Sequence, residues 1–266
     1  MRLLECKNDG ELSLTQFFDD IPPYAILSHT WGLEEVTFKD MMEGNGRSKA
    51  GFDKIRFCGE QAKHDGLQYF WVDTCCIDKS NGIELQGSIN SMFRWYRDSA
   101  KCYVFLADVP RADGDTADQS HQLPWESAFR RSRWFERGWT LQELIAPISV
   151  EFFSNDRKLL GDKKSLERYI CEITRIPSKA LRGSPLATFS VAERMSWAEV
   201  RKTTYEEDTV YSLLGIFDVY MALIYGEGKD RAFKRLREEI DKASKGKLLV
   251  IPLTKNKDTN LNRNST

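Results

Sequence analysis

The sequence predicts an α/β protein with a mainly parallel β-sheet, flanked by helices and followed by a helical extension. Before residue 155, short runs rich in apolar residues alternate with helical patterns, which is typical of βαβ units. Beyond residue 163 the pattern is helical up to residue 244. The chain has 266 residues, of which 41% are hydrophobic and 30% charged. This composition is globular, and the length suffices for one large core with an extension.

Four segments predict the strands of the sheet. They are YAILS (24–28), YFWVD (69–73), CYVFLADV (102–109) and ISVEFF (148–153). Their apolar residues form continuous runs, which indicates strands covered on both faces. The first run is the first clear strand, and Pro22 and Pro23 mark its start.

Helical patterns separate these runs. Residues 52–64 and 83–100 carry apolar side chains at spacings of three and four, as amphipathic helices do. Residues 125–145 are expected to be helical with a break at Gly138. The polar stretch 110–124 predicts an exposed loop.

We expect one domain with two parts and a tail. An α/β core occupies residues 1–160, a helical extension of the same domain occupies 161–245, and a polar tail occupies 246–266. Helices are predicted in the extension at 165–174, 190–202, 206–217 and 229–243. The tail has too little apolar surface to order itself.

Composition excludes several classes of protein. The 39 basic residues nearly balance the 40 acidic ones, and a net charge of -1 provides no field to hold nucleic acid. No run approaches the ~18 apolar residues of a membrane span, and the N-terminus lacks a signal peptide, so we expect a cytoplasmic protein. The six cysteines include the adjacent pair Cys75 and Cys76, a spacing that suits neither a disulfide framework nor a metal site. We therefore expect reduced thiols, no metal and no cofactor.

The first candidate site follows the strand that ends at Ser28. The run Ser28-His29-Thr30-Trp31-Gly32 places polar groups at the carboxyl end of a buried strand, where open α/β sheets bind ligands. Successive strand residues point to opposite faces, so Ser28 and His29 do not form a ready nucleophile and base. The structural alternative is a satisfied turn with Trp31 as a plug in the core.

The second candidate site lies at the exit of the next strand, from Asp73 to Lys79. Carboxylates, thiols and an amine share this loop. No neighbour in the sequence would lower the pKa of Cys75 as a nucleophile, and the spacing does not suit a metal. In the structural alternative, Asp73 only caps the end of the strand.

The third candidate site comprises Arg133, Arg137, Trp139 and Glu143 in RWFERGWTLQEL. Trp139 and Glu143 are four residues apart, so we expect an aromatic ring and a carboxylate on one helical face. The structural alternative is that Thr140 and Glu143 form a capping box that only starts a helix.

The common enzymatic motifs do not occur in the sequence. It has no GxGxxG after a strand, no GxxxxGK[ST], no HExxH and no GxSxG. The segment Gly226-Glu227-Gly228-Lys229 resembles a fragment of a phosphate loop but follows no strand. It predicts a turn at the start of a helix.

Taken together and in order, these clusters resemble the fungal heterokaryon-incompatibility (HET) domain. The resemblance rests on YAILSHTWG (24–32), FWVDTCCIDKSN (70–81), NSMFRWYRDSAKCYVFLADV (90–109) and RGWTLQELIAP (137–147). The resemblance extends over residues 1–245. The chain is similar to the subgroup of HET domains found at the N-terminus of fungal NOD-like receptors. HET domains are in turn similar to TIR domains, which implies a TIR-like, flavodoxin-like fold.

The same resemblance implies site residues and a substrate. In TIR enzymes the catalytic glutamate follows a tryptophan by four residues and precedes a leucine. Trp139, Glu143 and Leu144 match this pattern, with Thr140 where many TIR domains have cysteine. Glu143 is thus the expected catalytic residue and NAD the expected substrate. The expected substrate-binding residues are Ser28, His29, Trp31, Asp73, Cys75, Lys79, Arg133, Arg137 and Trp139.

Side-chain chemistry divides this set by role. Trp31 or Trp139 would stack on a ring, and Lys79, Arg133 or Arg137 would meet the diphosphate.

The function that the resemblance implies is an effector of programmed cell death in fungal non-self recognition, acting as an NAD glycohydrolase. Homo-oligomerisation is the expected switch, and a NOD-like receptor or an incompatibility partner is the expected regulator. The alternative is a non-catalytic signalling module that recruits death partners, in which Glu143 only caps a helix.

Overall fold

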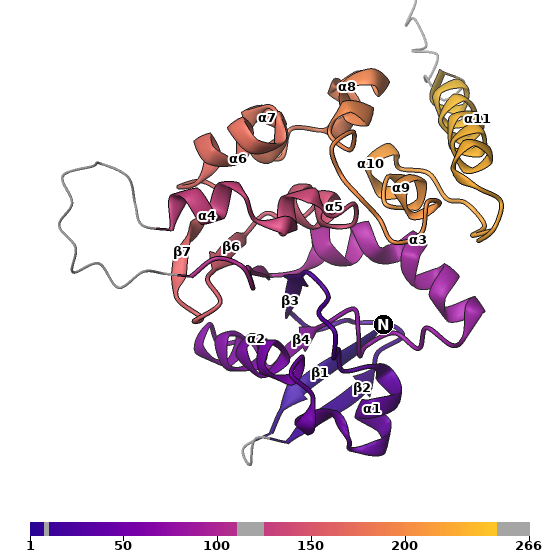
Figure 1. Ribbon diagram of the computed structural model, residues 1–266. Helices are drawn as coiled ribbons and strands as arrows, with labels where there is room; N and C mark the ends of the chain where they lie inside the picture. Colours follow the sequence, from indigo (N-terminus) through magenta and orange to yellow (C-terminus); the bar gives the residue numbers. More distant parts are fainter. Residues whose placement is uncertain (8–10, 111–124, 249–266) are drawn as a thin grey trace, which may run out of the picture.

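The computed structural model describes residues 1–7, 11–110 and 125–248, with side chains described up to residue 245. Within these ranges a seven-stranded sheet has the order β2-β1-β4-β3-β5-β6-β7 (Figure 1). The strands are β1 (Arg2–Cys6), β2 (Leu12–Gln16), β3 (Tyr24–His29), β4 (Tyr69–Trp71), β5 (Lys101–Phe105), β6 (Val150–Phe153) and β7 (Leu159–Asp162). The central strands β4, β3, β5 and β6 are parallel, whereas the pairs toward both edges are antiparallel.

The predicted α/β class and the four predicted strands are confirmed. Taken in chain order, the parallel strands lie in the order 2-1-3-4, as flavodoxin-like sheets begin. Strands β1 and β2, which form an antiparallel hairpin before the first predicted strand, were not predicted. The Asn8-Asp9-Gly10 sequence between two short, partly polar runs is the signal for that hairpin. Strand β7 has only four residues and no clear sequence pattern.

Helices cover the sheet and, joined by loops, make up the described chain after β7. The α-helices are α1 (Phe38–Glu43), α2 (Phe52–His64), α3 (Gly82–Asp98), α4 (Glu126–Arg130), α5 (Thr140–Ile145), α6 (Glu167–Thr174), α7 (Ser178–Leu181), α8 (Val191–Ser196), α9 (Asp208–Tyr211), α10 (Leu214–Phe217) and α11 (Lys229–Leu248). Short 3₁₀ helices are η1 (Gly46–Ser48), η2 (Arg133–Glu136) and η3 (Leu186–Thr188). Figure 1 shows α2 on one side of the sheet and α3 and α5 on the other.

The helix predicted over 125–145 is divided into α4, η2 and α5, and a tertiary contact explains the last break. The Gly138 N–H donates to the Lys202 carbonyl at 2.9 Å, and the Lys202 N–H donates to the Glu136 carbonyl at 2.5 Å. A Cβ at Gly138 would lie 2.4 Å from Cγ2 of Thr203. Only glycine therefore lets residues 202–203 approach so closely, and this pairing takes the backbone out of the helix.

The helical extension packs directly on the α/β core. Helix α10 lies against α3, where a Cβ at Gly215 would be 2.0 Å from Cβ of Phe93. Buried side chains of both parts, from Leu3 to Ile240, form one hydrophobic cluster. The predicted helix over 206–217 is divided into α9 and α10.

Some predicted segments fall partly outside the described residues. These are the loop, beyond residue 110, and the tail, beyond residue 248. Within the ranges given above, none of the helices is long and apolar enough to cross a membrane.

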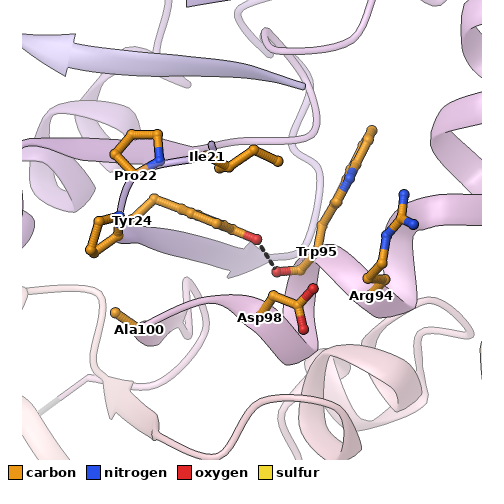
Figure 2. A pocket seen from close by; sticks show the side chains of 8 residues that line it. Ile21, Pro22, Tyr24, Arg94, Trp95, Asp98 and Ala100 are labelled. Atoms are coloured by element: carbon orange, nitrogen blue, oxygen red, sulfur yellow. Dashed lines mark hydrogen bonds between the residues drawn. The ribbon is translucent and has the colours of Figure 1, made fainter. Parts of the chain in front are cut away.

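Two open hollows lie along α3 on its side toward residues 16–24. The one in Figure 2 has a volume of about 410 Å³ and is lined by Tyr24, Trp95 and neighbouring residues. The other has a volume of about 500 Å³ and is lined by the end of β2 and the first half of α3. None of the predicted site residues lines either hollow.

Candidate functional site

The candidate site lies at the carboxyl end of β3. The next strand in the chain, β4, pairs on one side of β3, and β5 pairs on the other. This reversal of strand order is a topological switch point, where open α/β sheets bind ligands. Ser28 and His29 end the strand, and both are buried. As the strand geometry predicts, these two residues meet different partners.

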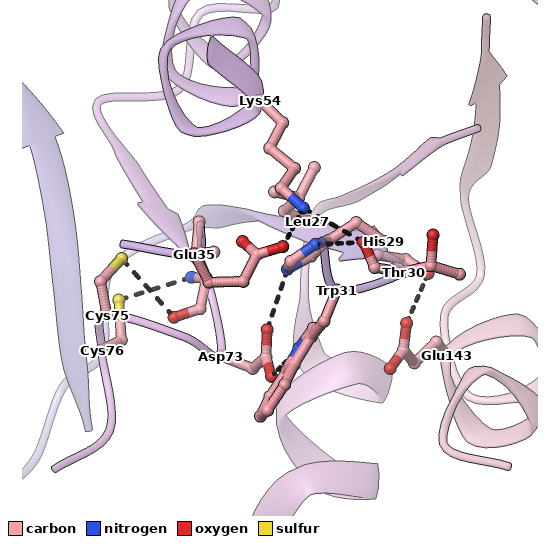
Figure 3. Close-up of polar contacts among 12 residues, drawn as sticks. Leu27, His29, Thr30, Trp31, Glu35, Lys54, Asp73, Cys75, Cys76 and Glu143 are labelled. Carbon is pink, nitrogen blue, oxygen red and sulfur yellow. Dashed lines mark hydrogen bonds and ion pairs between the residues drawn. The ribbon is translucent and has the colours of Figure 1, made fainter. Parts of the chain in front are cut away.

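Ser28 faces α5 and meets Glu143. The Ser28 hydroxyl donates to Oε2 of Glu143 at 2.5 Å, a contact drawn in Figure 3. The Trp134 Nε1–H donates to the same hydroxyl oxygen at 2.8 Å. Both Trp134 and Glu143 come from the segment after β5. The fold therefore brings Ser28 into contact with two residues far along the chain, Glu143 being 115 residues away.

Glu143 is a buried carboxyl group with a perturbed pKa. Its exposed fraction is 7%. Burial raises its pKa to about 8, and the negative charge of Asp73 adds to this. The hydrogen bond from Ser28 and the nearby Tyr96 and Arg201 act in the opposite direction. Glu143 is therefore mostly protonated at neutral pH.

Arg201 fixes the start of α5 in place of a capping box. Its Nη1 donates to the Arg137 carbonyl and to Oγ1 of Thr140, both at 2.8 Å. The Thr140 hydroxyl lies 2.6 Å from the Trp134 carbonyl, to which it donates. The capping-box alternative is contradicted, because Trp139 is the N-cap residue without a side-chain hydrogen bond and Glu143 turns to Ser28.

The carboxyl end of α5 is held by a second buried cation. The Lys163 ammonium donates to the carbonyls of Leu144, at 3.3 Å, and Pro147. Burial lowers the pKa of Lys163 to about 8. Helix α5 is thus fixed at both ends by side chains from later in the chain.

His29 faces the other side of β3 and meets a charged cluster. Its Nε2 lies 3.0 Å from Oδ1 of Asp73. Oδ2 of Asp73 accepts from Nε1 of Trp31 at 3.0 Å and from Nζ of Lys79 at 3.3 Å. The Lys79 ammonium also lies 3.7 Å from the centre of the Trp31 ring. Figure 3 shows Asp73 and Glu143 on opposite sides of the strand end.

Asp73 differs from Glu143 in its electrostatics. Burial alone would raise the pKa of Asp73, but Lys79 and His29 outweigh it and hold the pKa well below its usual range. Its oxygens accept from side chains, so it does more than cap the strand. Trp31 is 48% exposed, which contradicts the interpretation of this ring as a plug in the core.

Cys75 lies in the core. It is fully buried, and its thiol lies 4.0 Å from the Val72 carbonyl. The interaction with Cys76 and burial raise the pKa of Cys75 well above its usual value, so it is a poor nucleophile. The six cysteines, all within the described residues, form no disulfide with one another, and four of them are buried.

The remaining predicted residues face away from Glu143. Arg133 is largely exposed and pairs with Asp108 at 3.5 Å. Arg137 reaches Thr204 at 3.4 Å, and Nε1 of Trp139 donates to Asp208 at 3.2 Å. The structure therefore brings Ser28 to Glu143, and His29, Trp31 and Lys79 to Asp73. Within the third cluster, Arg133, Arg137 and Trp139 have other partners.

Sequence reasoning missed the residues that surround Glu143. They are Trp134, Tyr96 and Arg201, contributed by η2, α3 and the turn after α8. Trp134 lies within the RWFERGWT run, but no spacing rule favoured it over Trp139. For Tyr96 and Arg201 we find no local signal, because only the tertiary fold brings them to the site.

Comparison with known proteins agrees with this arrangement of motifs. A family model described as heterokaryon incompatibility protein (HET) matches residues 24–123. "Vegetative incompatibility protein HET-E-1" of Podospora anserina is 59% identical over 246 residues, which cover 91% of this chain. The chain spans only 18% of that protein's length. No solved structure matches the chain significantly. The chain therefore carries a heterokaryon-incompatibility (HET) domain.

Proposed function

We propose that this HET domain takes part in heterokaryon incompatibility as an effector of programmed cell death, and that it hydrolyses NAD at Glu143. The observation that carries the proposal is the Glu143 carboxyl group, buried at the switch point of the sheet with a pKa raised to about 8. Strongly perturbed groups in such positions are candidates for catalysis. The printed name of the Podospora anserina relative, a vegetative incompatibility protein, supports the biological role.

NAD hydrolysis suits a site with one buried carboxylate. The nicotinamide ring leaves from a bond in which it is already cationic, so no general acid is needed, unlike the two-carboxylate hydrolysis of ordinary glycosides. A carboxylate beside the ribose stabilises the positive charge that develops on the sugar, and water completes the reaction. Glu143 would supply this carboxylate.

The substrate itself would generate the charged form of Glu143. A cationic nicotinamide ring close to Glu143 favours the carboxylate and lowers its pKa. Ribose hydroxyl groups can replace the hydrogen bond that Ser28 now donates at 2.5 Å. Ionisation of Glu143 would therefore accompany binding instead of preceding it.

The other side of β3 offers contacts for the rest of the substrate. Trp31 presents a half-exposed ring on which a base can stack, and Lys79 supplies a cation for the diphosphate. Asp73 holds both side chains in place through its oxygens. Binding there would leave Asp73 outside the reacting centre.

The decisive experiment measures nicotinamide release from NAD by wild type and by Glu143→Gln. The amide keeps the size of the side chain but cannot carry the negative charge. We expect turnover to fall by about a thousandfold or more, as for loss of a group that stabilises transition-state charge. The assay is run at low and high protein concentration, since we also propose that self-association or an incompatibility partner activates the domain.

Glu126→Gln is the matched control. Glu126 is 8% exposed, close to the 7% of Glu143, but pairs with Arg130 at 3.0 Å, away from the site. This variant should retain activity. If both variants lose activity equally while remaining folded, Glu143 has no special role.

A non-catalytic module is the second candidate, and one observation favours it. The carboxyl group of Glu143 already accepts a hydrogen bond from Ser28 and has little surface exposed to a ligand. In that case wild type releases no nicotinamide at any concentration. Glu143→Gln would then kill fungal cells as effectively as wild type when each is expressed, whereas the enzymatic proposal requires the variant to spare them.

A further inference from the structure

The two edges of the sheet differ in how they are protected. Strand β7 is short, has an irregular register against β6, and ends at Asp162 beside Lys163. Strand β2 is LSLTQ, without charge or proline, and pairs with β1 in regular register over all five residues. In the described part of the chain, β2 has no strand on its outer side. Exposed edges normally carry charges, prolines or bulges that prevent pairing with another strand.

The hydrogen bonds at the two ends of the hairpin show which groups of β2 face outward. Met1 and Phe17 exchange backbone hydrogen bonds, each at 2.7 Å, and the Lys7 N–H donates to the Glu11 carbonyl at 2.8 Å. Bonded and non-bonded pairs alternate along an antiparallel ladder. The peptide groups of residues 11, 13, 15 and 17 therefore face β1. Those of Leu12, Leu14 and Gln16 face outward.

We propose that β2 is a self-association surface, on which a second copy of this chain pairs antiparallel through its own β2. A register centred on Leu14 pairs the whole strand: Leu14 faces itself, and Leu12 faces Gln16 of the second copy. The pairs Leu14–Leu14 and Leu12–Gln16 each exchange two backbone hydrogen bonds, so the outward peptide groups are satisfied on both strands. The two sheets become continuous.

The composition of β2 favours a second copy as the occupant. In a symmetric pair both strands carry the same side chains, so a charged residue on one strand could face a like charge on the other. Strand β2 has no charged residue. In this register Ser13 faces Thr15 of the second copy in a non-hydrogen-bonded pair, where side chains are closest. Hydroxyl pairs of this kind stabilise adjacent strands.

Exposed apolar surface lies beside this edge. Phe18 follows β2 by two residues and is 83% exposed, and Ile21 is 42% exposed. Both line the hollow of about 500 Å³, as Gln16 does. A second copy at the edge can cover this surface, which adds to the area buried by five residue pairs.

The test uses charge at the facing pair 13 and 15. The side chains of Leu12 and Leu14 pack toward the core, so those of Ser13 and Thr15, which are half-buried, point to the other face. Ser13→Lys with Thr15→Lys places like charges opposite each other across the two-fold axis. Ser13→Lys with Thr15→Glu places opposite charges there. Molar mass is measured by sedimentation equilibrium on the 266-residue chain.

We expect wild type and the lysine–glutamate variant to approach twice the 30.7 kDa of one chain as concentration rises, and the double-lysine variant to stay at 30.7 kDa. Circular dichroism checks that both variants fold. A wild type that remains monomeric up to its solubility limit overturns the proposal. So does a dimer that survives the double-lysine change. The surface would serve the self-association proposed above as the activating step. Sedimentation does not measure NAD hydrolysis, so failure of this surface and failure of the proposed catalytic activity are distinguishable.

Discussion

Ser28 and His29 are neighbours on one strand, yet they lead to two carboxyl groups in opposite electrostatic states. Glu143, which meets Ser28, is buried and has a pKa raised to about 8. Asp73, which meets His29, has a pKa held well below its usual range. Burial pushes both values up, so the difference comes from the partners. Asp73 has an ammonium and an imidazole within hydrogen-bond distance, whereas Glu143 has a hydroxyl.

This contrast indicates how roles divide at the site. A carboxylate that is permanently charged and paired can orient its neighbours, as Asp73 orients Trp31 and Lys79. A carboxyl group with a raised pKa can change its charge when a cation arrives. Catalytic sites often contain two carboxyl groups whose pKa values are shifted in opposite directions by their environments.

The largest effect should appear in the pH dependence of stability. The folded-state pKa of Glu143 is raised from 4.5 to about 8, so the folded state binds more protons than the unfolded state between these values. Its contribution to the free energy of unfolding is complete below pH 4.5 and is lost as the pH rises through 8. At about 1.4 kcal/mol per pKa unit, this contribution to the free energy of unfolding amounts to several kcal/mol.

Glu143→Gln removes this titration and should flatten the profile, because the amide has no charge to bury. Urea unfolding of both proteins at several pH values between 4.5 and 9 checks this. Parallel profiles for the two proteins would mean that the pKa of Glu143 is ordinary and that the contrast with Asp73 does not exist.

A smaller effect of opposite sign is expected at Asp73. Its pKa is lowered, so it stabilises the fold above pH 3.8 and less as the pH falls below that value. Asp73→Asn should reduce the free energy of unfolding by about 2 kcal/mol at pH 7, through loss of charged hydrogen bonds. The deficit should shrink in acid. Asp53→Asn, at a side chain 70% exposed, is the control and should change little.

The smallest effect is expected at Lys79. Its side chain is one-third exposed, so its ion pair and its contact with Trp31 should together contribute less than about 1 kcal/mol. Lys79→Met is measured by the same unfolding assay, alone and with Asp73→Asn. A loss as large as that of Asp73→Asn would assign the low pKa of Asp73 to Lys79 alone and leave no role for His29.

Features of the site that depend on local sequence could be predicted. Side-chain directions that depend on contacts with distant residues could not. Ser28 and His29 end one buried apolar strand, and Asp73 follows the next. Because parallel strands end at a common edge, the grouping of these residues follows from the pattern. The direction of the Trp139 side chain could not be predicted, because its indole N–H donates a hydrogen bond to Asp208 in the extension. A helical spacing of four residues gave no sign of that competing partner.

The α/β class, the four central strands and the HET motifs follow from local sequence, since continuous apolar runs and their order are local properties. The state of Glu143 depends on tertiary contacts. Its burial, its bond to Ser28, the Trp134 indole that donates to the same hydroxyl and the Arg201 guanidinium at the start of α5 come from segments far apart in the chain. A pKa depends on which groups meet in space and how far water is excluded, and neither is written in residue spacing.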